Sequence, residues 1–124
     1  MDPKSAYLSR PWLKFYEPGV PSDLEVPLKS VPQAFDEATA RFGAKAALVF
    51  YGREISFREL RDHTDRLAGA LAGFGLKKGD RVALYLLNSP QFVIAYFAAL
   101  KIGCTVTPIS PVYTSHEVKF QLEN

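Results

Sequence analysis

The sequence predicts an α/β fold in which helices cover a mainly parallel β-sheet and one β-hairpin lies beside it. Apolar residues recur at helical spacing in residues 30–43 and 56–75. By contrast, RVALYLL at 81–87 is a continuous apolar run, as expected for a strand buried on both faces of a parallel sheet, and CTVTPIS at 104–110 is predicted to be a further strand. An apolar helical segment separates the two runs, and the order strand, helix, strand is typical of a right-handed parallel crossover.

Residues 1–29 are expected to form an irregular arm that precedes an α/β region over residues 30–124. Prolines at positions 3, 11, 18, 21 and 27 interrupt every helix that could form here. The arm is nevertheless rich in aromatic side chains, which is unusual for a disordered tail. We therefore predict that it lies over the surface of the domain with its aromatic side chains in grooves of the core, and docking to a partner or a lipid surface is the alternative.

The first helix is predicted to begin at Ser30, a good N-cap, with Pro32 tolerated in its first turn. Gly43 is expected to end this helix as a C′ glycine, in the left-handed conformation typical of that position. The apolar stripe of the helix consists of Val31, Phe35, Ala38 and Phe42.

The stretch AALVFYGREISF at 46–57 predicts a hairpin followed by a second helix. Two apolar runs flank Gly52-Arg53, a pair that suits a two-residue type II′ turn. Ser56 and Glu59 then form a capping box, and Gly75 is expected to end the helix. Its predicted apolar stripe consists of Phe57, Leu60, Thr64, Leu67, Leu71 and Phe74.

The second half of the chain alternates strands with helices. The turn NSP at 88–90 opens a helix that is apolar nearly all round, so it should be buried on several sides until Gly103 ends it. Thr114 and Glu117 form a second capping box, for a helix that has barely completed two turns at residue 124. We expect this last helix to continue outside the sequence, because no terminating signal follows it.

No motif in the chain predicts a catalytic, cofactor-binding or metal-binding residue. Gly73, Gly75 and Gly79 are spaced one residue too far apart for a dinucleotide fingerprint, and they close a helix instead of opening one. Gly75 is therefore interpreted as a helix cap and Gly79-Asp80 as a turn.

The remaining polar candidates are also interpreted as structural. His63 is expected to face solvent among charged helix neighbours, and His116 to lie in the first turn of the last helix. Cys104 is predicted to be a small core residue, and Ser89 lacks the surroundings of a nucleophile elbow. Adjacent lysines at 77 and 78 could touch an anion, but such pairs are usually solvated.

Composition excludes several classes of function. The 124 residues carry a formal net charge of +2, which is too small to indicate a nucleic-acid partner. The single cysteine favours a reducing compartment, and the amino terminus lacks the apolar region of a secretory signal. The most apolar run, FVIAYFAAL, is far shorter than the ~20 residues that span a bilayer. We expect a cytoplasmic protein, with peripheral membrane association as an alternative.

The order of these segments resembles the beginning of AMP-forming acid–CoA ligases of the adenylate-forming superfamily. The strongest pieces are ISFRELRDHTDRLAGAL, KKGDRVALYLLNSPQFVIAYFAALKIG and PVYTSHEVKFQLEN. The opening PWLKFYEPGVP is similar to the entry segment of long-chain fatty acid–CoA ligases in particular. Ser110 stands where these enzymes often have asparagine, and Cys104 where a small residue such as alanine is common.

The resemblance implies that the chain is an incomplete N-terminal subdomain of a larger ligase. Such an enzyme converts an acid and ATP to acyl-AMP and pyrophosphate, with Mg²⁺ sharing the phosphate charge, and then transfers the acyl group to CoA. The phosphate loop, ribose-binding acid and catalytic lysine of the family have no matching positions here. The segment is therefore expected to be scaffold, to bind none of these cofactors and to be inactive alone.

Two alternatives remain open. The chain could be a self-contained, non-catalytic interaction module derived from the ligase scaffold. The parent could also be a ligase for an aromatic or short-chain acid, or use an acceptor other than CoA.

The expected partners are the remainder of the same polypeptide and the parent's fatty acid, ATP and CoA. In isolation, we expect the segment to self-associate through its C-terminal region or to fray after residue 115.

Overall fold

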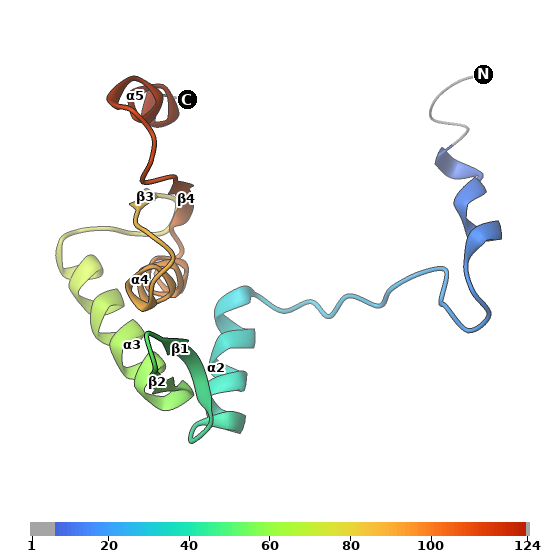
Figure 1. Cartoon of the computed structure of the whole chain (residues 1–124), viewed down its shortest axis with the longest axis horizontal. Helices are drawn as coiled ribbons and strands as arrows, with labels where there is room; N and C mark the ends of the chain where they lie inside the picture. Colours follow the sequence, from blue (N-terminus) through green and yellow to red (C-terminus); the bar gives the residue numbers. More distant parts are fainter. Residues whose placement is uncertain (1–6, 124) are drawn as a thin grey trace.

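The computed structural model describes residues 7–123, and Figure 1 shows a body of helices and strands with a long arm. The elements follow in the order η1 (Pro11–Phe15), α2 (Val31–Phe42), β1 (Ala46–Phe50), β2 (Arg53–Ser56), α3 (Phe57–Gly73), β3 (Arg81–Tyr85), α4 (Pro90–Lys101), β4 (Thr105–Ile109) and α5 (Ser115–Glu123).

The predicted α/β architecture is confirmed. Strands β3 and β4 are parallel neighbours, with Arg81 opposite Thr105 and Tyr85 opposite Ile109. Helix α4 connects them and packs against both strands. Within residues 7–123, β1 and β2 form a separate antiparallel pair. Both parallel strands are slightly shorter than the runs 81–87 and 104–110 from which they were predicted.

The core is built around α4, which contacts α3 most extensively and α2 less. Ala98 and Ala99 of α4 are completely buried. Phe35 of α2 stacks on Phe97 of α4 with ring centroids 4.2 Å apart. The α3 stripe is confirmed at Leu60 and Thr64, which are buried. It fails at Phe74, which is exposed because it lies beyond the helix end, at the C-cap.

The expectation that residues 81–87 form a strand buried on both faces is wrong. Leu84 is buried and Val82 is half-buried, whereas Ala83 and Tyr85 are exposed on the other face. The reason is that α4 covers only one side of the pair. Among the described elements, none packs extensively against the opposite side, and α5 stands away from it (Figure 1).

Local signals predicted the helix ends well. The capping boxes of Ser56–Glu59 and Thr114–Glu117 are both formed. Gly75, at φ 93°, ends α3 with bonds from Gly75 N to Ala72 O and from Leu76 N to Leu71 O, the pattern of a Schellman motif.

Gly43 does not adopt the left-handed conformation expected of it. Helix α2 ends at Phe42 as predicted, but Gly43 has φ −41° and ψ −39°. The chain continues in right-handed geometry into a tight turn, in which Lys45 N donates to Phe42 O at 2.7 Å. A Cβ at this position would lie 3.2 Å from Thr39 O, so lack of space is the better reason for a glycine here.

The hairpin is confirmed, but its predicted turn is wrong. Phe50 pairs with Arg53, so the two turn residues are Tyr51 and Gly52 rather than Gly52 and Arg53. Both have positive φ, 47° and 80°, which is the signature of a type I′ turn instead of type II′. The twist of a type I′ turn matches that of the flanking strands, and this outweighs the unfavourable conformation of Tyr51.

The arm does not lie over the body. It runs away from α2 (Figure 1), and its large apolar side chains are exposed, among them Tyr7, Leu8, Phe15, Leu24 and Val26. Tyr7 instead contacts Trp12 within the arm, with ring centroids 5.2 Å apart. One turn of 3₁₀ helix, η1, interrupts the predicted irregular course. Of the helices described here, none is long and apolar enough to cross a membrane.

Candidate functional site

The parallel strands β3 and β4 end at the same edge of their sheet, which we call the carboxyl edge (residues 86–89 and 110–114). In open α/β sheets, ligands bind in the crevice outside the carboxyl ends of parallel strands. Here the crevice is a cavity of about 460 Å³. It is lined by residues 86–88, by Phe92 of α4 and by residues 108–113.

Two helices begin at this edge. Ser89 caps α4 by accepting a hydrogen bond from Phe92 N at 3.4 Å, and Pro90 occupies the first helical turn. Thr114 caps α5, and its hydroxyl and backbone N–H both donate to Glu117 Oε2 at 2.7 Å. These hydrogen bonds hold the pKa of Glu117 below its ordinary value. Both helix starts therefore direct the positive ends of their dipoles toward the strand ends.

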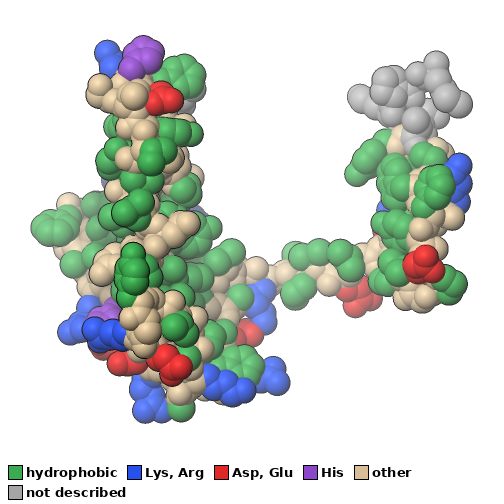
Figure 2. Space-filling model, viewed as in Figure 1, with side chains coloured by type: hydrophobic (Ala, Val, Ile, Leu, Met, Phe, Trp, Pro, Cys, Tyr) green, Lys and Arg blue, Asp and Glu red, His purple; other side chains and the backbone are tan. Residues whose placement is uncertain are grey.

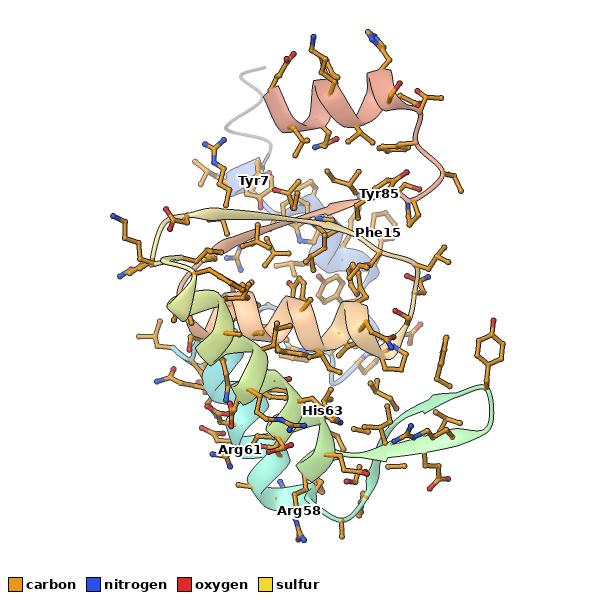
Figure 3. All side chains as sticks on the ribbon, turned by 90° about the vertical axis from the view of Figure 1, so that its left-hand side faces the viewer. Tyr7, Phe15, Arg58, Arg61, His63 and Tyr85 are labelled. Atoms are coloured by element: carbon orange, nitrogen blue, oxygen red, sulfur yellow. The ribbon has the colours of Figure 1, made fainter. Side chains whose placement is uncertain are left out.

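A tyrosine joins the two loops of the carboxyl edge. Tyr85 is the last residue of β3, and Figure 3 places it below the segment that leads to α5. Its hydroxyl lies 2.9 Å from the carbonyl oxygen of Pro111 and 3.4 Å from that of Tyr113. A phenol donates one hydrogen bond, so the two carbonyl oxygens share it. This contact fixes the path of the chain between β4 and α5.

The lining of the carboxyl edge is apolar or neutral. Among the described residues, the cavity is lined by no acidic, basic or histidine side chain. Such a surface can bind and orient an apolar or uncharged part of a ligand, but it offers no acid, base or strong nucleophile. The carboxyl edge is therefore a candidate for positioning rather than for chemistry.

The residues considered from the sequence are dispersed. His116 is exposed in the first turn of α5, as predicted, whereas His63 is half-buried rather than facing solvent. Cys104 is buried as predicted; burial, with a smaller contribution from the charge of Asp80, raises the pKa of its thiol. Lys77 and Lys78 are exposed beside the turn at Gly79-Asp80, which is confirmed by a bond from Asp80 N to Lys77 O.

Sequence reasoning missed the residues of the carboxyl edge, such as Asn88, Ser110 and Tyr113. The available signal was their position, directly after two strands that were predicted to be parallel.

Residues 7–123 bring together no group of three His, Cys, Asp or Glu side chains that could hold a metal ion. The described residues thus provide no donor set for the Mg²⁺ that the resemblance implies.

Comparisons with known proteins agree with this architecture. The family model for AMP-binding enzymes matches residues 35–124. The long-chain-fatty-acid–CoA ligase of Bacillus subtilis is 39% identical over 115 residues, which cover 93% of this chain and 20% of that protein. A crotonobetaine/carnitine–CoA ligase of Salmonella paratyphi B is 33% identical over 101 residues, which cover 77% of this chain and 20% of that protein.

A solved structure shows the same fold. The N-terminal subdomain of NpsA from Klebsiella oxytoca, in complex with 3-hydroxyanthranilyl-AMSN, matches with a TM-score of 0.76 and 36% identity. The match covers 77% of this chain and 25% of that one. The chain spans about a fifth of the length of the curated relatives it matches. Since the family model covers most of its residues, the chain belongs to the family of AMP-binding enzymes.

Proposed function

We propose that the chain is the N-terminal portion of an AMP-forming fatty acid–CoA ligase. In the first half-reaction, a carboxylate oxygen of the fatty acid attacks the α-phosphorus of ATP and pyrophosphate leaves. In the second, the thiol of CoA attacks the acyl carbon and AMP leaves. ATP, CoA and Mg²⁺ would be bound by the longer polypeptide.

The observation that carries the fatty acid assignment is the match to the arm. The alignment with the B. subtilis long-chain-fatty-acid–CoA ligase covers 93% of the chain, so it includes most of residues 1–29. The alignment with the crotonobetaine/carnitine–CoA ligase covers only 77%. Because the alignment with the fatty acid enzyme takes in most of the arm as well as the α/β region, it supports a fatty acid substrate.

The role of the chain within that enzyme is scaffolding. The carboxyl edge would present its apolar cavity and two helix starts toward the ligands, while the reacting groups come from elsewhere in the polypeptide. The neutral lining of the cavity supports this division, because neither half-reaction could draw an acid or a base from it.

A second candidate is a ligase for an aromatic acid. It is favoured by the structural match to NpsA, whose subdomain was solved with 3-hydroxyanthranilyl-AMSN. The two candidates differ only in the acid, since the adenylation chemistry is common to both.

Competition between acids in the longer polypeptide that contains this segment separates the candidates. We expect a medium- or long-chain fatty acid to exceed both acetate and benzoate in kcat/KM for acyl-CoA formation. A preference for benzoate would replace the fatty acid by an aromatic acid. Failure of every acid to form an acyl-AMP would contradict the ligase function itself.

A further inference from the structure

A second cavity lies between the hairpin and the helices α3 and α4, beside the start of α4. Its volume is about 550 Å³, and it shares no lining residue with the cavity at the carboxyl edge. Its walls come from β1–β2, from the middle of α3 and from the first turns of α4. We call it the hairpin pocket. Its size falls within the range of pockets that bind small molecules.

One side of the hairpin pocket is cationic. Arg53 of β2 and His63 and Arg66 of α3 line it, and among residues 7–123 no carboxylate does. Figure 2 shows the corresponding gathering of basic and histidine side chains over α3 and the hairpin. Arg66 Nη2 lies 3.2 Å from His63 Nδ1. A guanidinium can only donate, so Nδ1 accepts and the imidazole retains Nε2–H as a second donor.

The carboxylates near this side are already engaged or exposed. Glu59 accepts hydrogen bonds from the backbone N–H and hydroxyl of Ser56, both at 2.8 Å. These bonds, with smaller contributions from the charges of Arg53 and His63, lower its pKa. Asp62 pairs with Arg66 at 3.2 Å, but both side chains are about two-thirds exposed, so the pair is weak. Arg53 forms no ion pair with any carboxylate in the described part of the chain.

The opposite side of the pocket is apolar. Phe50 and Ile55 come from the hairpin, Leu67 from α3, and Pro90 and Ile94 from α4. A guanidinium binds a carboxylate in a planar, two-point geometry, and two guanidinium groups with an imidazole suit one such anion. An aliphatic chain is the natural complement of the apolar wall.

We propose that the hairpin pocket binds an aliphatic carboxylate, with the carboxylate between Arg53 and Arg66 and the hydrocarbon chain along Phe50, Leu67 and Ile94. This inference goes beyond the proposed function, because it concerns a second site that neither the adenylation nor the thiol transfer uses. Binding here would stand even if the longer polypeptide activated a different acid.

Calorimetric titration of the 124-residue chain with decanoate, below its micelle concentration, tests the site. Decanol has the same hydrocarbon tail as decanoate but no charge, and acetate has the carboxylate charge but no long hydrocarbon tail. We expect decanoate to bind saturably to one site, at least about tenfold more tightly than either. The double variant Arg53→Gln/Arg66→Gln should weaken decanoate binding by at least about tenfold, because it removes both charge-assisted contacts and the loss of one alone has about that effect.

The matched control is Arg58→Gln/Arg61→Gln, which removes the same charge and also one exposed ion pair, Arg61–Asp65. Neither of its residues lines the pocket, and the control should bind decanoate as the parent does. The proposal would be overturned if decanol bound as tightly as decanoate, or if both double variants lost the same affinity for decanoate. It would also be overturned if decanoate showed no saturable binding. If the first variant does not fold, Arg66→Gln alone must weaken binding severalfold, and unchanged affinity would overturn the proposal equally.

Discussion

The hydroxyl of Tyr85 lies 2.9 Å from the carbonyl oxygen of Pro111, and this contact joins the ends of β3 and β4 across 26 residues of chain. It orients the segment between β4 and α5, which forms one wall of the carboxyl edge. The scaffold role proposed for this chain depends on such a fixed edge, because a positioning surface must hold its shape.

Replacing Tyr85 by Phe should remove this bond without removing the ring. We expect the free energy of unfolding to fall by about 0.5–1.5 kcal/mol, the net value of one neutral hydrogen bond. Amide exchange of residues 112–118 should also accelerate. Tyr51→Phe is the control, since Tyr51 is 95% exposed and should lose almost nothing. If the Tyr85→Phe and parent chains unfolded at the same urea concentration, the hydrogen bond of Tyr85 would not stabilise the fold.

Lys101 should be a principal electrostatic link among the helices. Its Nζ lies 2.7 Å from Asp36 Oδ1 of α2, contacts Asp65 of α3, and sits 5.6 Å from the ring centre of Phe35. The Lys101 side chain is only 15% exposed. Lys101→Met keeps the apolar stem but leaves Asp36 without its cation and Asp65 with only its exposed pair to Arg61. We expect a loss of about 1.5–3 kcal/mol in urea unfolding, as for hydrogen bonds to charged groups.

The pH dependence of this loss has a definite sign. Burial acts to lower the pKa of Lys101, but the hydrogen bonds and charges of Asp36 and Asp65 outweigh it and raise the pKa above its ordinary 10.5. A raised pKa means that the link is fully present just below pH 10.5 and is lost as pH rises through the folded-state pKa. The difference between parent and Lys101→Met should therefore shrink as pH rises into strong alkali. Lys119→Met, which removes an exposed pair with Glu123, should show little difference at any pH.

The hairpin turn should be improvable at Tyr51. A tyrosine at φ 47° is unfavourable, and asparagine is the preferred residue at this position of a type I′ turn. We expect Tyr51→Asn to raise the free energy of unfolding by about 0.5–1 kcal/mol, after allowance for the lost contact with the Phe50 ring. Gly52→Ala, at φ 80°, should destabilise. A stabilising Gly52→Ala, seen by thermal unfolding, would contradict the type I′ assignment.

Two glycines should respond to alanine in opposite directions. Gly103 has φ 81°, and a Cβ there would lie 2.9 Å from Lys78 Cγ, so Gly103→Ala should cost about 1–3 kcal/mol. Gly69 lies within α3, and nothing is within 4 Å of its would-be Cβ. Gly69→Ala should therefore stabilise by about 0.5–1 kcal/mol. Thermal unfolding of both variants measures the contrast, and destabilisation by Gly69→Ala would show that this surface of α3 is covered.

The sequence predicted best what depends on neighbouring residues. The capping boxes at Ser56 and Thr114 and the helix end at Gly75 each rely on contacts within a few residues, so their signals are local. The pairing of β3 with β4 was also predictable, because a buried helix between two apolar runs leaves few topologies. The turn at Tyr51 was misplaced by one residue because the strand pairing, and not the glycine alone, sets the register.

Features that depend on distant contacts could not be predicted. The aromatic composition of the arm indicated burial, but composition does not identify the surface that buries it. Likewise, an apolar run such as β3 does not reveal whether one or both of its faces are covered. The carboxyl edge was missed because Asn88 and Tyr113 carry no motif, and they become neighbours only when the strands pair.

We propose that these residues contribute scaffold, and not chemistry, to an AMP-forming ligase. Acid-dependent exchange of labelled pyrophosphate into ATP distinguishes the two roles, because the exchange requires only the first half-reaction. We predict no exchange above background by the pure 124-residue chain with decanoate, acetate or benzoate, and clear exchange with decanoate by the longer polypeptide that contains it. Exchange by the 124-residue chain alone would contradict the claim.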